Sequence, residues 1–405
     1  MLILNSTAMI KSIREAYNES FKTQQYAGFL AEIEHFFPGA LDFRIAETPV
    51  FIDKAMRNKM IDTCEYIISK IQEEAFLSHT ASAIPVEERV SGPEKPCQFI
   101  AFDFGICTNV DGIAEPALIE LQGFPTLFCF QAFYPSILEK YFTIPSGYSQ
   151  FFSDYTRESY IELLKQIIVG SNNPENVILL EIKPHEQKTR IDFYCTVRYL
   201  GITIVCISEL FTEDNKIFYL KEGRKIQVNR IYNRVIGDEL KQVQKMMDIK
   251  FDITGNWDVE WIPHPNWFYR ISKYTLPLLN HPYIPETKFL SDLSSIPVNL
   301  EDYVLKPLFS FAGQGVVIDL KREDLNDIND PENWILQRKM KYADCIETPD
   351  GLAKAEVRIM YMWEDRTKRP VPVTNLARLS KGKMIGTRYN KDKSWVGGTV
   401  AYFEQ

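Results

Sequence analysis

The chain has 405 residues, of which 45% are hydrophobic and 25% are charged, and its net charge is −8. This length predicts two or three globular domains with well-developed cores. The negative charge argues against a nucleic-acid-binding protein, because such proteins usually carry a basic surface. No apolar run in the sequence approaches the roughly 20 residues of a membrane-spanning helix, so we expect no membrane partner either.

The cysteines and the first residues bear on the cellular compartment. Seven cysteines are present and no two form a C-x-x-C pair, which favours reduced thiols over a disulfide framework or a zinc site. The chain starts Met-Leu-Ile-Leu-Asn, without basic residues ahead of its apolar ones, so we expect no secretory signal. Together these features predict a cytoplasmic protein, and they leave the oligomeric state open.

Residues 1–95 show mostly helical periodicity. Apolar side chains recur at spacings of three and four, for example at Met60, Cys64 and Ile67, which is the pattern of a helix with one buried face. Residues 80–96 carry three prolines and indicate a connection.

The middle of the chain alternates between strand-like and helix-like segments. An apolar segment at 176–181, an amphipathic one at 188–200 and a second apolar one at 202–208 predict a βαβ unit with parallel strands. A helix is also expected at 157–168. The alternation of polar and apolar residues at 225–234 predicts a further strand.

Two apolar strands in this region carry polar side chains. Residues 99–104 contain Asp103, and residues 116–125 contain Glu120 and Gln122. Glu120 and Gln122 are two apart, so on a strand they point to the same face. A carboxylate in so apolar a strand is costly unless it is paired or coordinated. These side chains are therefore candidate ligands, unless the strand ends simply reach solvent.

Residues 303–320 contain two apolar runs around a turn with Ala312, Gly313 and Gly315. This pattern predicts a β-hairpin with a longer loop. Lys306 is the charged residue of the first run. A lysine beside a loop whose glycines let backbone N–H groups approach a ligand can hold phosphates. The alternative is an ordinary hairpin whose lysine reaches out to solvent.

The later part of the chain is expected to form strands at 334–340, 354–363 and 371–380. The last two carry Arg358 and Arg378. A dense run of lysines and arginines follows; it is either a solvated hairpin or, beside a nucleotide, a source of attraction for phosphates.

The order of these features resembles the ATP-grasp superfamily. The matching elements are Leu305-Lys306-Pro307, the glycine turn, the segment Ile335-Leu-Gln-Arg-Lys339 and the two late arginines. The resemblance implies an α+β fold in which ATP is clamped between two mainly antiparallel α+β lobes. It places Arg378, together with Arg358, at the transferring phosphate as catalytic residues. The nucleotide contacts that it implies are Lys306, Ser310, Ala312, Gly313, Gln314, Gly315, Gln337, Arg338 and Lys339.

The position of the candidate metal ligands narrows this resemblance. Ordinary ATP-grasp enzymes carry their acidic ligands near the end of the fold, whereas here Asp103 and the segment Glu120-Leu-Gln122 lie early. This order resembles the circularly permuted ATP-grasp proteins of the glutathionylspermidine synthetase family, in their synthetase part only, without the amidase domain. Asp103, Glu120 and Gln122 are then the implied Mg²⁺ ligands. Ala101 stands where that family has an arginine, and Gln122 where it has an asparagine.

The resemblance also implies a domain order. A helical N-terminal region (1–95) would precede a small βαβ, pre-ATP-grasp-like α/β region (96–240) that carries the metal ligands. The nucleotide-binding region would follow (241–405).

The implied activity is an ATP- and Mg²⁺-dependent ligase that forms an amide through an acyl phosphate. Its substrates would be a small-molecule or peptide carboxylate and an amine, such as a polyamine or an amino acid. Two alternatives stay open. One is a non-catalytic nucleotide-binding homologue, which the departures at Ala101 and Gln122 favour. The other is a phosphotransferase that stops at a phosphorylated product.

Overall fold

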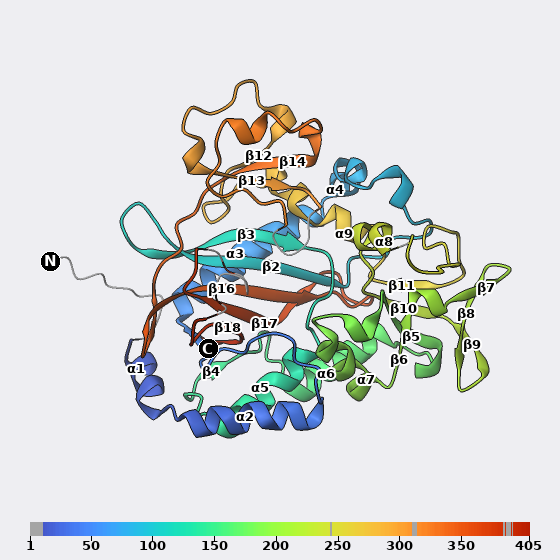
Figure 1. Ribbon diagram of the computed structural model, residues 1–405, viewed down its shortest axis with the longest axis horizontal. Coiled ribbons are helices and arrows are strands. Elements are labelled where there is room, and N and C mark those ends of the chain that lie inside the picture. Colours follow the sequence, from blue (N-terminus) through green and yellow to red (C-terminus); the bar gives the residue numbers. More distant parts are fainter. Residues whose placement is uncertain (1–10, 244, 310–313, 384, 386–389, 391) are drawn as a thin grey trace.

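The computed structural model describes residues 11–243, 245–309, 314–383, 385, 390 and 392–405. A central antiparallel sheet organises the molecule (Figure 1). Its strands, from one edge to the other, are β18 (Gly397–Thr399), β17 (Val371–Ser380), β16 (Gly351–Met362), β2 (Phe99–Thr108) and β3 (Ala114–Gln122), and β15 (Ile346–Thr348) pairs with β16. Strands of the early and late parts of the sequence therefore share one sheet.

One face of this sheet is covered by helix α3 (Lys54–Ile71), whose N-cap Asp53 accepts a hydrogen bond from the Met56 amide. Apolar side chains of α3 form a continuous core with those of β2 and β16, including Phe102 and Ile359. The periodicity that predicted a helix here thus corresponds to its buried stripe.

The other face meets a helical layer, which lies below the sheet in Figure 1. Its helices include α1 (Lys11–Ser20), α2 (Thr23–Phe36), α5 (Phe130–Tyr141) and α6 (Arg157–Ile168). Residues 11–79 are largely helical, as predicted, and α4 (Glu74–His79) completes this part. A strand that the sequence did not indicate, β1 (Val50–Ile52), pairs with β19 (Ala401–Glu404), which also pairs with β4 (Tyr148–Ser149).

A parallel sheet lies beside the central one, and the predicted βαβ unit is confirmed in it. Strands β5 (Val177–Glu181) and β6 (Thr203–Cys206) are parallel and are joined through α7 (Arg190–Leu200). The strand order continues from β5 to β10 (Arg230–Asn233) and β11 (Glu260–Ile262), all parallel.

The prediction of a single strand at 225–234 was wrong. The segment is divided between β9 (Arg224–Val228), which pairs with β8 (Lys216–Lys221) in an antiparallel sheet completed by β7 (Phe211–Glu213), and β10 of the parallel sheet. The division falls at Asn229, whose amide donates to the Asn176 carbonyl. Alternation continues across the break, so the sequence pattern did not reveal it.

A small antiparallel sheet lies above the β3 edge of the central sheet in Figure 1. Its order is β12 (Thr287–Phe289), β14 (Trp334–Arg338), β13 (Tyr303–Pro307). The hairpin predicted within 303–320 is confirmed only in part: among the described residues, its two runs meet in one antiparallel bridge, in which Leu305 and Val317 exchange two backbone hydrogen bonds. Along its length β13 pairs with β14. Leu305 and Leu336 meet in the small core on one face of this sheet, and Val317 packs against the same core.

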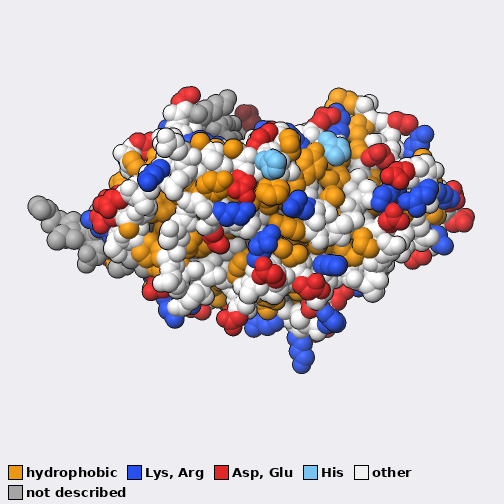
Figure 2. Space-filling view, turned by 90° about the horizontal axis from the view of Figure 1, so that it is seen from below, with side chains coloured by type: hydrophobic (Ala, Val, Ile, Leu, Met, Phe, Trp, Pro, Cys, Tyr) orange, Lys and Arg blue, Asp and Glu red, His pale blue; other side chains and the backbone are white. Residues whose placement is uncertain are grey.

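Short helices complete the fold, namely α8 (Gly237–Val243) and α9 (Trp267–Arg270). None of the helices in the described ranges is long and apolar enough to cross a membrane. On the face seen in Figure 2, acidic and basic side chains are interspersed with small apolar areas, in keeping with the modest net charge of −8.

Candidate functional site

Charged side chains form a row on one face of the central sheet. Asp103 of β2 lies directly opposite Arg358 of β16, and Glu356 of β16 lies directly opposite Arg378 of β17. Residues opposite each other in an antiparallel pair share a face, as do Glu356 and Arg358, two apart on one strand. The sheet itself therefore assembles two carboxylates and two guanidinium groups.

These four side chains form an ion-pair network. Arg358 binds Asp103 through two hydrogen bonds, Nε to Oδ1 at 2.5 Å and Nη2 to Oδ2 at 2.6 Å. Arg378 donates through Nη2 to Asp103 Oδ2 at 3.0 Å and also binds Glu356. The Tyr342 hydroxyl donates to Glu356 Oε2 at 2.9 Å. Paired in this way, the buried carboxylates avoid the cost of an isolated charge.

Both carboxylates are buried, but the pKa of Asp103 is lowered and that of Glu356 is raised. Burial alone would raise the pKa of Asp103, but the guanidinium groups of Arg358 and Arg378 outweigh it and hold that pKa below its usual range. For Glu356, burial dominates and raises the pKa, although the Arg378 charge opposes it. Asp103 is thus the more firmly ionised of the two carboxylates.

Lys306 of the small sheet reaches the β3 edge of the central sheet. Its residue is only 8% exposed. Its Nζ donates to Gln337 Oε1 at 2.6 Å and to the Ile119 carbonyl of β3 at 3.0 Å. Burial lowers the pKa of Lys306 to about 8, although the nearby Glu120 carboxylate opposes this shift. The lysine therefore links the small sheet to the central sheet.

Glu120 lies directly opposite Asp103 across the β2–β3 pair. A second lysine that the sequence analysis did not single out, Lys273, lies beside it: its Nζ is 3.7 Å from Glu120 Oε1. Lys273 is buried and starts the short 3₁₀ helix Lys273–Leu278. It lies in an aromatic-rich but irregular segment, where no strand or helix periodicity sets it apart from its neighbours.

Gln122 ends strand β3 opposite Ala101, on the same face as Asp103 and Glu120. Its Nε2 donates to the Phe124 carbonyl at 3.3 Å. The expected strand face is thus present, with three oxygen-bearing side chains along it.

Two further residues predicted to contact the nucleotide, Gln337 and Arg338, lie on opposite faces of the small sheet. Gln337 is buried on the Lys306 face of the small sheet. Arg338 points to the other face, as alternation requires, where it is half-exposed, 3.6 Å from Asp302 and over the Tyr303 ring.

Lys339 Nζ lies 3.4 Å from Asp319 Oδ1. Gln314 is exposed, and Gly315 has φ +75°, a conformation that glycine adopts readily. The other three loop contacts lie outside the residues that the structure describes: Ser310, Ala312 and Gly313.

The donors on this strand face suit Mg²⁺ chemically. Among the residues that the structure describes, no three His, Cys, Asp or Glu side chains are grouped as a complete metal site. Mg²⁺ is usually held through one or two carboxylates and completes its shell with water and phosphate oxygens. Asp103 and Glu120 supply that number. Asp103 accepts three donors from the arginines, and a carboxylate offers about four lone-pair positions, so one position remains.

Comparison with known proteins gives the fold. No protein-family model and no curated protein matches the sequence. The structure is similar to that of a glutathione synthetase-like effector, GSS30, from Globodera pallida in its apo form, with a TM-score of 0.55 and 9% identity over 95% of this chain and 97% of that chain. At this identity the similarity concerns the fold alone. The chain therefore shares the mixed α+β fold of this glutathione synthetase-like protein.

Proposed function

We propose that the protein is an ATP- and Mg²⁺-dependent carboxylate–amine ligase. The observation that carries the proposal is the meeting of Lys306, from the small sheet, with Glu120, Asp103 and Arg378 on the central sheet. Phosphoryl transfer asks a protein for positioning and charge neutralisation more than for covalent chemistry. Lysine and arginine side chains from the two sheets surround a pair of carboxylates, so the arrangement can both position a nucleotide and neutralise its charge.

The nucleotide is proposed to lie between the small sheet and the β3 edge. Lys306 and the loop after β13 would hold its phosphates, and Lys273 lies close enough to lower the pKa of Lys306 further. Gln337 is the member of the 337–339 segment that shares the Lys306 face, so it would line the adenine side. Arg338 and Lys339 would border this site through their backbone.

Asp103, Glu120 and Gln122 would hold Mg²⁺, which supplies neutralisation of phosphate charge when bound. Arg378 has a side chain that is 39% exposed although two carboxylates anchor it. A guanidinium has five N–H donors, so it retains donors for the transferring phosphoryl group. Arg358 is more deeply buried against Asp103, and its proposed part is to hold that carboxylate and assist Arg378.

In the proposed reaction, a substrate carboxylate oxygen attacks the γ-phosphorus of ATP and the bond to the β-phosphate oxygen breaks, giving an acyl phosphate and ADP. The amine then attacks the acyl carbon, loses a proton and displaces inorganic phosphate. The resemblance to glutathionylspermidine synthetases supports a peptide carboxylate and a polyamine-type amine. Ala101 removes an arginine contact of that family, so the substrate need not be glutathione.

The carboxylate is proposed to approach from the parallel sheet. Its strand order reverses between β5 and β10, and ligands of such sheets bind outside the carboxyl ends of the strands at this reversal. Arg234, just after β10, donates to the Pro125 carbonyl at 2.5 Å, three residues beyond Gln122. The reversal point therefore lies along the continuation of the strand that carries the proposed metal ligands.

A non-catalytic nucleotide-binding protein is the second candidate, and it is supported by the similarity of the structure to that of an effector. ADP release separates the two. The protein should release ADP from MgATP only when a carboxylate and an amine are both supplied; release with the carboxylate alone would indicate the phosphotransferase.

Asp103→Asn should reduce this turnover at least about a hundredfold, because it removes a charge from the proposed metal site and weakens the anchoring of Arg358, while Glu356 still binds Arg378. Magnesium titrations provide the readout: the variant should need more Mg²⁺ for half-maximal rate. Asp365→Asn, at a surface ion pair with Lys95, is the matched control. Absence of ADP release with a broad panel of carboxylates and amines, despite ATP binding, would favour the second candidate.

The affinity for ATP should fall as the pH rises through about 8. Because burial lowers the pKa of Lys306 to about 8, its positive charge, which attracts phosphate, is lost above that pH. We expect about a tenfold loss between pH 7.5 and 9.5 by calorimetric titration, and no such loss in Lys306→Met. Between about pH 8 and pH 10.5, the unfolded chain holds more protons on Lys306 than the folded protein does. The free energy of unfolding therefore increases with pH in this range.

A further inference from the structure

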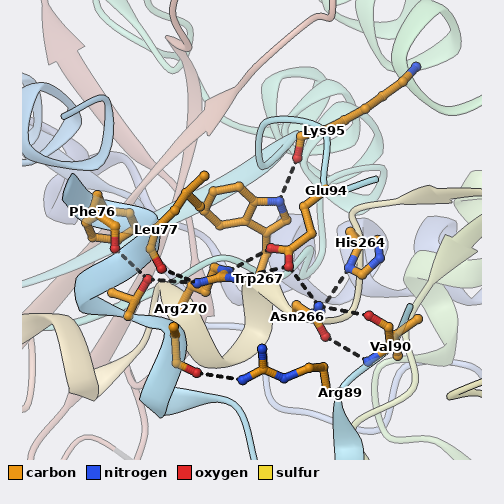
Figure 3. A network of polar contacts seen from close by, with 12 residues as sticks. Phe76, Leu77, Arg89, Val90, Glu94, Lys95, His264, Asn266, Trp267 and Arg270 are labelled. Carbon is orange, nitrogen blue, oxygen red and sulfur yellow. Dashed lines mark hydrogen bonds and ion pairs between the residues drawn. The ribbon is translucent and has the colours of Figure 1, made fainter. Parts of the chain in front are cut away.

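A network of polar contacts joins the segment that carries Lys273 to the connection at residues 77–95 (Figure 3). We infer that the ion pair between Glu94 and Arg270 at its centre is a positioning device for Lys273, which it holds beside Glu120 for the phosphates of the nucleotide. This inference rests on the proposed function. Neither Glu94 nor Arg270 is proposed to touch the nucleotide.

Arg270 uses four of its five N–H donors in hydrogen bonds to its partners. Its Nε donates to Glu94 Oε2 at 2.7 Å and its Nη2 to Glu94 Oε1 at 3.0 Å, a two-bond pairing. Its Nη1 donates to the Leu77 carbonyl at 2.8 Å and to Thr80 Oγ1 at 3.2 Å. The side chain is 8% exposed and that of Glu94 is 20% exposed. A paired guanidinium with this geometry fixes direction as well as distance.

Further contacts of the same network hold the start of this segment. Asn266 Nδ2 donates to Glu94 Oε1 at 2.9 Å, and its amide group exchanges two hydrogen bonds with the backbone of Val90. Trp267 Nε1 donates to the Lys95 carbonyl at 2.7 Å. The close-up in Figure 3 shows these side chains converging on Glu94 and Arg270. The anchoring therefore fixes helix α9 as a unit.

From Arg270 to Lys273 the chain is held at each step. The Arg270 carbonyl accepts from Thr275 Oγ1 at 2.8 Å, and the Ile271 carbonyl accepts from the Gly123 amide at 2.7 Å. Ser272 caps the 3₁₀ helix that Lys273 starts. A shift of Arg270 would thus be transmitted to the backbone of Lys273.

Lys273 needs an anchor because the proposed site brings it close to a second positively charged lysine, Lys306. Lys273 and Lys306 reach adjacent residues of β3, namely Glu120 and the Ile119 carbonyl, and two ammonium groups brought together in a buried region repel each other. Without an external anchor, the lysine on the irregular segment would move away more easily than Lys306, which is part of a strand. The Glu94–Arg270 pair supplies this anchor from outside the site.

The test is a double-mutant cycle on ATP affinity, measured by calorimetry with a non-hydrolysable ATP analogue and Mg²⁺. Arg270→Lys should weaken binding about tenfold, and Glu94→Gln should act in the same direction. Lys273→Met should also weaken binding, and adding Arg270→Lys to it should cause no further loss. If the Arg270→Lys variant does not fold, the cycle is measured with Glu94→Gln and Lys273→Met instead, and the same results are expected.

The matched control is Arg230→Lys. Arg230 and Glu260 form a comparable pair on β10 and β11, with Nε 2.8 Å from Oε2 and side chains 7% and 30% exposed. This variant should lower thermal stability as Arg270→Lys does, without weakening nucleotide binding. Hydrogen exchange adds a readout that needs no nucleotide: Arg270→Lys, but not Arg230→Lys, should speed exchange of the amides at 271–279.

The outcomes separate the two proposals. If the unaltered protein binds the nucleotide but the losses from Arg270→Lys and Lys273→Met add, or if Arg230→Lys weakens binding equally, the positioning role is overturned and the proposed function stands. If the unaltered protein binds no nucleotide, the proposed function fails and the positioning inference fails with it.

Discussion

Replacing Lys306 with methionine is expected to weaken ATP binding by one to two decades. The variant removes a buried ammonium group that reaches both the Ile119 carbonyl and Gln337 Oε1. Losing a charge-assisted contact to phosphate costs about 1.5–3 kcal/mol, and each 1.4 kcal/mol is a factor of ten in affinity. Methionine preserves most of the aliphatic stem, so the packing of β13 should survive.

Calorimetric titration with ATP and Mg²⁺ measures this effect, and thermal unfolding reports on the fold. Lys288→Met is the matched control, because Lys288 lies on β12 of the same sheet but is largely exposed beside Glu286. It should bind ATP as the unaltered chain does. Equal affinities for the Lys306 variant and the unaltered chain would remove the centre of the proposed nucleotide site.

Arg378→Ala should act on turnover instead. If its free donors contact the phosphoryl group mainly in the transition state, their loss lowers kcat with little change in nucleotide affinity. Removing a comparable donor to developing charge costs about a factor of 10² to 10³ in kcat. Glu356 would also lose its guanidinium partner, while Asp103 would keep Arg358.

Single-turnover and steady-state rates, together with the dissociation constant for ATP, resolve this split. Arg366→Ala, at an exposed arginine paired with Glu364, controls for loss of surface charge and should leave both quantities unchanged. A collapse of ATP affinity with normal turnover at saturation would reassign Arg378 to nucleotide binding.

Most helices and strands whose apolar residues follow a regular spacing were predicted correctly from the sequence. The helix at 157–168 and the βαβ unit follow from apolar spacing alone, and both are present. The strands predicted at 354–363 and 371–380 are present as well, as β16 (Gly351–Met362) and β17 (Val371–Ser380). In each case a single buried face or a fully buried strand imposes its period on the sequence.

Contacts between segments that are distant in the sequence could not be predicted from apolar spacing. The predicted hairpin is confirmed by one bridge among the described residues, but β13 pairs along its length with a strand about 30 residues later, and nothing in the local pattern of 303–320 indicates that second partner. Lys273 was missed because it lies on a short 3₁₀ helix in an irregular segment, without periodicity to set it apart. Asp103 and Arg358 were singled out separately, but no sequence pattern showed that they bind each other across 255 positions.

That separation has a consequence for how the protein is made. Strands β2 and β3 leave the ribosome long before β16, which pairs with β2 along its length, and the partner of Asp103 follows 255 residues later. At synthesis rates of 5–20 residues per second this interval is about 10–50 s. Throughout it, the apolar β2 presents an unpaired edge of the kind that promotes aggregation. The nascent chain is therefore a natural client for chaperones that shield such edges until translation reaches the late strands.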